Sequence, residues 1–120
     1  MNAMSDLLEA KYLLDECVPL GYREVTSKEY LELKEILPTG TPDHVVLDEA
    51  EKLGLTVITM DSKFVLSAII QSRDIIYQNK RGYRFYISSS SKIIEKNCNQ
   101  KSFGKKITKY LVSNDRVIMP

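Results

Sequence analysis

Carboxylates follow two apolar runs of this sequence and open a third element, and their spacing is suited to metal chemistry. Asp15 and Glu16 end one run, Asp61 ends another, and Asp43 begins a predicted helix. Because sites in an open parallel sheet form at the carboxyl ends of its strands, we expect these side chains to share one edge. Oxygen ligands of this kind suit Mg²⁺ or Mn²⁺, which can activate water and neutralise charge on a phosphodiester.

Each of these acids also has an ordinary structural explanation. Asp43 lies in a first helical turn, where the helix dipole favours a negative charge. Asp61 is suited to cap the helix that follows it, and Asp15 with Glu16 is compatible with a surface loop. The metal-site hypothesis therefore depends on the combination of the four carboxylates.

Charge is divided along the chain, although the net charge is only +1. Residues 1–61 carry 13 acidic and 5 basic side chains, a net charge of −8. Residues 62–120 carry 12 basic and 3 acidic side chains, a net charge of +9. We expect an acidic and a basic side of the surface, and the basic side suits a polyanion. Mutual attraction between the two halves is the simpler alternative.

Basic and aromatic residues alternate in the second half of the chain. Lys80 and Arg81 precede a predicted strand that contains Arg84 and Tyr86. Residues two apart on a strand share a face, so Arg84 and Tyr86 would together suit a single-stranded nucleic acid. Our predicted nucleic-acid contacts are Lys63, Lys80, Arg81 and Arg84.

Short patterns predict the elements before residue 40. The apolar run 11–14 indicates a buried strand, 18–21 a turn, and 22–26 a second short strand. Capping-box spacing over 26–29 predicts a helix that continues to Ile36.

The middle of the chain has the clearest local signals. Thr41 suits a helix N-cap, Pro42 the first helical position, and Gly54 the end of that helix. The run 55–60 predicts a β-branched strand, and a helix is expected over 63–72.

Strands return in the last third of the chain. The runs 75–77 and 82–88 predict two strands joined by a turn, and 116–119 predicts an edge strand. Helices are expected to begin near Ile93 and to close at 107–112.

Strands that alternate with helices indicate an α/β fold with a largely parallel central sheet flanked by helices. The 120 residues are 43% hydrophobic and 28% charged, which is ordinary for one compact domain spanning the whole chain. Met1, Asn2 and Ala3 precede Met4 and are interpreted as residues left by cloning.

Three short motifs resemble those of the prokaryotic PIN-like domains. Residues 13–19, Leu-Leu-Asp-Glu-Cys-Val-Pro, resemble the opening Leu-Leu-Asp-Glu-Asn-x-Pro of that family. Residues 40–43, Gly-Thr-Pro-Asp, are similar to its Gly-x-x-Asp element. Residues 57–64, Val-Ile-Thr-Met-Asp-Ser-Lys-Phe, resemble its closing Val-Thr-x-Asp-x-Asp-Phe. Order and approximate spacing agree over residues 11–64.

The resemblance implies a compact PIN-like α/β fold and metal-dependent cleavage of single-stranded or structured RNA. It carries over Asp15, Asp43 and Asp61 as the catalytic carboxylates, with Glu16 as a further ligand of Mg²⁺ or Mn²⁺. It also implies a toxin–antitoxin arrangement, in which a protein inhibitor or antitoxin restrains the nuclease.

Three departures from the family pattern bear on this expectation. Lys63 stands where the last motif has a second Asp, and Cys17 stands where Asn is usual. The stretch 19–26 is short for the family's first helix. Loss of a ligand affects metal binding more than packing. These departures therefore bear on the predicted activity more than on the predicted fold.

The remaining reactive residues favour structural roles. Acids beside Cys17 raise a thiol's pKa, so a position in or near the core is favoured over a nucleophile. His44, the only histidine, is expected on the surface of a first helical turn. Cys17 and Cys98 form no metal-type pair and suit a reducing cytoplasm. We also expect no signal peptide and no membrane partner.

The sequence therefore predicts a metal-dependent endoribonuclease, with homodimerisation left open. One alternative is a catalytically degenerate PIN-like domain that acts as a nucleic-acid- or protein-binding regulatory module, as Lys63 indicates. A second is a receiver-like signalling domain phosphorylated at Asp61, because the chain length and the acids after two strands also fit that class.

Overall fold

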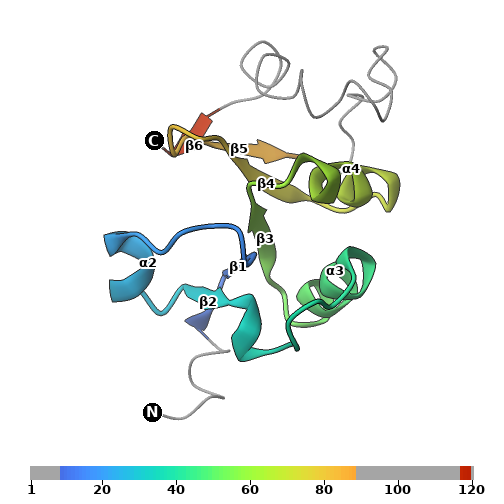
Figure 1. Ribbon diagram of the computed structural model, residues 1–120, viewed down its shortest axis with the longest axis horizontal. Coiled ribbons are helices and arrows are strands. Elements are labelled where there is room, and N and C mark those ends of the chain that lie inside the picture. Colours follow the sequence, from blue (N-terminus) through green and yellow to red (C-terminus); the bar gives the residue numbers. More distant parts are fainter. Residues whose placement is uncertain (1–8, 89–116, 120) are drawn as a thin grey trace.

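A computed structural model describes residues 9–88 and 117–119 of the chain (Figure 1). In chain order, their strands and helices are β1 Tyr12–Leu14, α2 Tyr22–Thr26, β2 Tyr30–Glu32, the 3₁₀ turn η1 Leu33–Glu35, α3 Asp43–Lys52, β3 Thr56–Thr59, α4 Ser62–Ile70, β4 Ile75–Gln78, β5 Arg84–Ile87 and β6 Val117–Met119. The helices predicted near Ile93 and at 107–112 lie outside the described residues.

The described strands form one six-stranded sheet in the order β2-β1-β3-β4-β5-β6. The first four strands of this order run parallel, whereas β5 and β6 are antiparallel to their neighbours. The α/β class with a largely parallel sheet is confirmed, and so are the strand pair β4–β5 and the edge strand β6.

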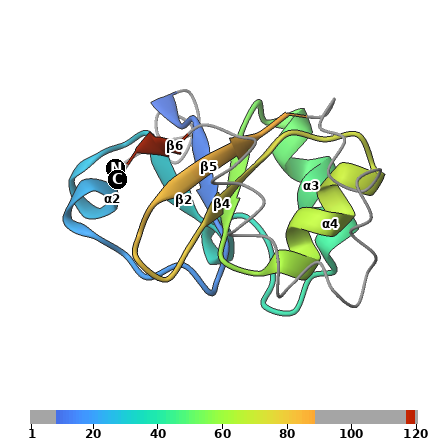
Figure 2. The same cartoon turned by 90° about the horizontal axis from the view of Figure 1, so that it is seen from above.

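Alternation along the strands divides the core between the two faces of the sheet. Leu13, Val57 and Ile75 are fully buried on the face that α3 and α4 cover. Their neighbours Leu14 and Ile58 lie in a smaller cluster on the other face. Figure 2 shows α3 and α4 together on one side of the strands and α2 on the other. Each buried aliphatic side chain contributes about 1.5–3 kcal/mol through the hydrophobic effect.

Helix α3 begins and ends close to the predicted positions. Its N-cap is Pro42, one residue later than predicted, because the Thr41 hydroxyl donates to the Pro38 carbonyl instead of capping the helix. Val46 and Ala50, one helical turn apart, are buried on the face of the helix that meets the sheet. Gly54 follows the helix with φ +70°, a conformation that favours glycine.

Helix α4 also matches its prediction, and its N-cap is Asp61. Asp61 Oδ1 accepts a hydrogen bond of 2.9 Å from the backbone N–H of Lys63. The structural explanation for this carboxylate is therefore correct, and it leaves the second carboxylate oxygen available to another group.

The predicted strand at 22–26 is wrong, because this segment forms helix α2. Helical geometry turns Glu24 inward, where it accepts from the backbone N–H of Gly21 at 3.0 Å and from the guanidinium of Arg84. The side chains of Tyr22 and Val25 remain exposed, so their β propensity does not decide the conformation.

The predicted helix from 26 to Ile36 is also wrong, because β2 and η1 occupy most of it. Glu29 N–H donates to Ser27 Oγ at 3.2 Å, so the apparent capping box is a local turn. Pairing of β2 with β1 then stacks Tyr30 on Tyr12 with ring centroids 5.1 Å apart.

None of the helices in residues 9–88 is long and apolar enough to cross a membrane.

Candidate functional site

Two of the predicted carboxylates lie within two residues of the ends of neighbouring parallel strands. Asp15 comes after β1 and Asp61 comes two residues after β3, and β1 pairs with β3 in parallel register. Asp43 is the first residue of α3, whose N-terminus returns to the same edge. Figure 2 shows the connections that follow β1 and β3 on the same side of the sheet, low in the view. The fold therefore brings three separate segments to one place, as the strand-end argument predicts.

A pocket of about 240 Å³ lies between these segments. All four predicted metal ligands line it. The complete lining is Asp15, Glu16, Cys17, Leu33, Gly40, Thr41, Asp43, Val46, Asp61 and Phe64. Lys63 does not line this pocket; it is exposed in the first turn of α4. Its ammonium group therefore does not stand in the place where a cation would bind.

Thr59 joins two of the carboxylate segments. Its hydroxyl donates to Asp15 Oδ2 at 2.8 Å and accepts from the backbone N–H of Asp61 at 3.0 Å. Thr59 is fully buried at the end of β3, so this hydroxyl is shielded from competing water. Sequence analysis missed this residue; the signal was a threonine two positions before an acid at the end of a core strand.

Cys17 supplies a second contact to the same carboxylate. Its Sγ donates to Asp15 Oδ2 at 3.2 Å and accepts from Met60 N–H at 3.3 Å. Cys17 is exposed, so its predicted core position is wrong. Desolvation raises the pKa of the Cys17 thiol, and the neighbouring Asp15 raises it further, which disfavours the reactive thiolate.

The carboxylates of the pocket repel one another. Burial raises the pKa of Asp43 above its ordinary value, and the charges of Asp61 and then Asp15 raise it further. Among the described residues, no ion pair involves any of these three aspartates. Among the described side chains, only His44 opposes this charge at Asp43, as the smallest effect on its pKa, and a bound cation would relieve the repulsion.

The donor chemistry of the pocket fits a hard divalent cation. Its carboxylate oxygens are the ligands that Mg²⁺ and Mn²⁺ prefer. In the part of the chain that the structure describes, no three His, Cys, Asp or Glu side chains meet as ligands of one ion. An ion bound here would therefore be held by at most two of these side chains and would keep several of its waters, as Mg²⁺ often does.

The predicted nucleic-acid contacts separate into two groups. Lys63, Lys80 and Arg81 are exposed, and the last two lie in the turn after β4, at the carboxyl edge. Arg84 is 1% exposed, so its predicted role in contacting nucleic acid is wrong. It forms a buried ion pair with Glu24 and donates to Gln78 Oε1 at 2.7 Å. Arg84 has these partners because a buried arginine, which has lost its contact with water, requires hydrogen bonds and an opposite charge.

His44 is exposed on the first turn of α3, as predicted, and is not among the residues that line the pocket.

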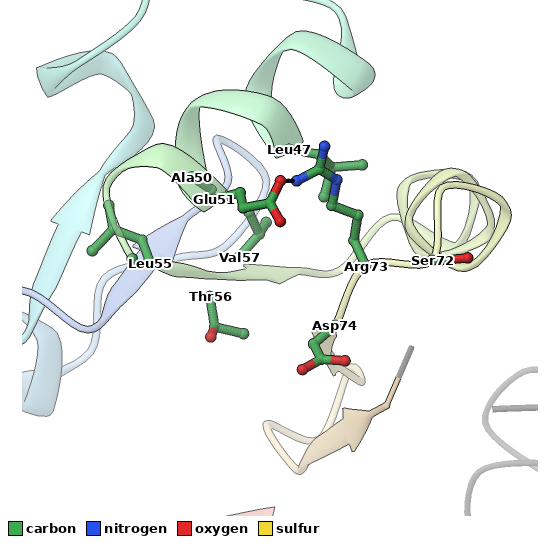
Figure 3. Close-up of a pocket in the computed structure, with 10 residues that line it drawn as sticks. Leu47, Ala50, Glu51, Leu55, Thr56, Val57, Ser72, Arg73 and Asp74 are labelled. Carbon is green, nitrogen blue, oxygen red and sulfur yellow. Dashed lines mark ion pairs between the residues drawn. The ribbon is translucent and has the colours of Figure 1, made fainter. Parts of the chain in front are cut away.

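A second pocket, of about 370 Å³, lies at the opposite edge, before β3 and β4. Figure 3 shows the Arg73 side chain extending across it toward Glu51. Arg73 also pairs with Asp48 Oδ1 at 2.7 Å. The cation of this pocket is therefore already neutralised by two carboxylates of α3.

No family model, curated protein or solved structure matches this chain. The carboxylate pocket is therefore the feature of the described residues that bears most directly on function.

Proposed function

We propose that this chain is a PIN-like endoribonuclease that cleaves RNA phosphodiesters with a Mg²⁺ or Mn²⁺ ion held by carboxylates. One observation carries the proposal: Asp15, Asp43 and Asp61 come from separate segments and line one pocket, where burial, and then the charges of Asp61 and Asp15, raise the pKa of Asp43. The motifs that contain these residues resemble the PIN-like motifs in the same order.

The bound ion would polarise the phosphodiester and lower the pKa of a water. Asp15 and Asp61 would hold the ion, and Glu16 lines the same pocket, where it would act through one of the waters that the ion keeps. Thr59 keeps Asp15 oriented through its 2.8 Å hydrogen bond. Asp43, whose pKa is raised, is the carboxylate best suited to accept a proton from the attacking water. Lys63, Lys80 and Arg81 are exposed cations that would hold RNA phosphates.

The test compares the parent chain with Asp15→Asn and with a matched control, Asp48→Asn. Asp48 is exposed on α3, and its partner Arg73 keeps a second carboxylate in Glu51. Mn²⁺ binding is measured by calorimetry, and cleavage is followed on fluorescent single-stranded and structured RNA.

We expect Asp15→Asn to lose Mn²⁺ binding and to reduce cleavage about 10²–10³-fold, the equivalent of several kcal/mol of transition-state stabilisation. The control should match the parent. Unchanged cleavage in Asp15→Asn would remove the proposed metal role.

The alternative is a degenerate PIN-like domain that binds nucleic acid or protein without cleaving RNA. Two observations favour it: no three side chains of the described residues meet as ion ligands, and Lys63 replaces an acid of the resembled motif. Lys63→Asp decides between the two proposals in the same assay. If the parent is inert and Lys63→Asp cleaves RNA, the degenerate module is correct.

The proposed partners are RNA and a protein inhibitor or antitoxin that covers the site. A cytoplasmic location follows from this proposal, because its substrate is found there.

A further inference from the structure

The turn between β4 and β5 is held in one conformation by a buried asparagine. Asn79 is 7% exposed, and its Oδ1 accepts from the backbone N–H groups of Arg81 and Tyr83, both at 3.0 Å. Asn79 N–H donates to the Tyr83 carbonyl, and Gly82 N–H donates to the Asn79 carbonyl, each at 3.0 Å. Gly82 has φ +87°, where a glycine is favoured. The turn is therefore preorganised.

The base of this hairpin is also anchored. Gln78 and Arg84 are paired across β4 and β5, and their side chains hydrogen bond at 2.7 Å. Arg84 then pairs with Glu24 of α2. Buried polar contacts thus hold both the turn and the strands that carry it, so the side chains of the turn need little further ordering to bind a ligand.

The turn presents two cations and one aromatic ring to the surroundings. Lys80 and Arg81 are exposed, and neither forms an ion pair with another described residue. Tyr83 is 41% exposed, although its backbone N–H is fixed by Asn79. Cations beside an exposed aromatic face are the combination that binds single-stranded nucleic acid.

The turn lies at the same edge of the sheet as the carboxylate pocket. Strands β1, β3 and β4 are adjacent and parallel, so the turn after β4 stands beside the ends of β1 and β3. Two strand spacings of about 4.8 Å separate β1 from β4, which is roughly 10 Å. Figure 2 shows the turn and the connections after β1 and β3 on the same side of the molecule.

We infer that the β4–β5 turn is a binding site for an unpaired nucleotide, in which Tyr83 stacks on the base and Lys80 and Arg81 contact the flanking phosphates. A base within a duplex has both faces covered by its neighbours, so this site selects single-stranded RNA over paired RNA. The inference rests on the proposed function, because it gives the substrate class of the same nuclease. Binding at the turn itself requires no metal.

The test measures fluorescence anisotropy of a labelled oligoadenylate and of an RNA duplex of equal length, with EDTA present. The variants are Tyr83→Ala, Tyr83→Phe and the matched control Tyr22→Ala, since Tyr22 is 86% exposed on α2. Circular dichroism checks that each variant is folded. Lys80→Ala and Arg81→Ala are titrated at several salt concentrations.

We expect the parent to bind the single strand more tightly than the duplex. Tyr83→Ala should weaken binding of the single strand roughly tenfold or more, as loss of one stacking contact does. Tyr83→Phe and Tyr22→Ala should keep the parent affinity. The slope of log affinity against log salt is negative, and removal of Lys80 or Arg81 should each reduce its magnitude by about 0.7.

Four results would overturn the inference: no binding by the parent, equal binding of the duplex, normal binding by Tyr83→Ala, or equal losses in Tyr83→Ala and Tyr22→Ala. The EDTA assay separates this inference from the proposed nuclease. If Tyr83→Ala loses binding while the parent cleaves no RNA in Mn²⁺, the binding site stands and the nuclease fails. If Asp15→Asn abolishes cleavage while Tyr83→Ala binds normally, the nuclease stands and this site fails.

Discussion

The two edges of the parallel strands differ in how their charged side chains are arranged. At the carboxyl edge, Asp15, Asp43 and Asp61 line one pocket, and burial together with the charges of Asp61 and Asp15 raises the pKa of Asp43. At the opposite edge, Arg73 lies between two carboxylates of α3 and pairs with both. The first arrangement concentrates charge of one sign, whereas the second cancels it. Concentrated like charge lowers the stability of the fold unless a ligand of opposite charge is bound, so it indicates binding rather than structural support.

Among variants that test this comparison, we expect the largest effect, on Mn²⁺ affinity and cleavage, from Thr59→Val. Valine has nearly the same shape but cannot donate to Asp15 or accept from Asp61 N–H. Loss of a group that orients a metal ligand typically reduces metal affinity or activity about 10–100-fold. Mn²⁺ affinity and cleavage are measured beside Thr56→Val, a control on the same strand. Equal behaviour of the two variants would show that Thr59 does not position the carboxylates.

A smaller effect, on stability alone, is expected from Arg73→Met. Methionine keeps much of the packing but leaves Asp48 and Glu51 without their shared cation. Both carboxylates are more than half exposed, so we expect a loss of about 1–2 kcal/mol in the free energy of unfolding. Urea unfolding measures it, and Mn²⁺ affinity should not change. A change in Mn²⁺ affinity would contradict the separation of the two edges.

The smallest effect on the free energy of unfolding is expected from Asp43→Asn. This variant should be more stable than the parent, whereas Arg73→Met at the opposite edge should be less stable. Because the pKa of Asp43 is raised, the folded chain holds this proton to higher pH than the unfolded chain. The contribution of Asp43 to stability is therefore present below its unfolded pKa and is lost as pH rises through the folded pKa. Without metal at neutral pH, Asp43→Asn should gain about 0.5 kcal/mol.

Added Mn²⁺ should narrow or reverse this difference, because Asp43→Asn removes one negative charge from the pocket and Mn²⁺ then stabilises the variant less than the parent. Thermal unfolding with and without Mn²⁺ measures both effects, and Asp48→Asn is the control on the same helix. A parent that is more stable than Asp43→Asn without metal would show that Asp43 supports the fold through the helix dipole.

Local patterns predicted the elements whose conformation depends mainly on neighbours in the chain. Helix α3 begins within one residue of the start predicted from Pro42 and ends before Gly54 as predicted, because proline and glycine restrict or permit backbone angles wherever they occur. Buried apolar runs likewise predicted β3 and β4. Because strand ends lie where the apolar runs stop, the sequence also predicted that Asp15 and Asp61 would share an edge.

Tertiary contacts decided the elements and roles that sequence reasoning missed. The segment 22–26 is helical because Glu24 pairs with Arg84, a residue 60 positions away that no local pattern connects to it. The same pair buries Arg84 and removes it from the predicted nucleic-acid surface.

The sequence by itself therefore determined the fold class and the carboxylates that share one edge, because hydrophobic alternation and backbone restrictions act over a few residues. Only the tertiary structure decided that Thr59 joins Asp15 to Asp61, and that Asn79 holds Tyr83 beside two cations. Hydrogen bonds and buried ion pairs of this kind depend on distances between segments that the chain sets only when it folds.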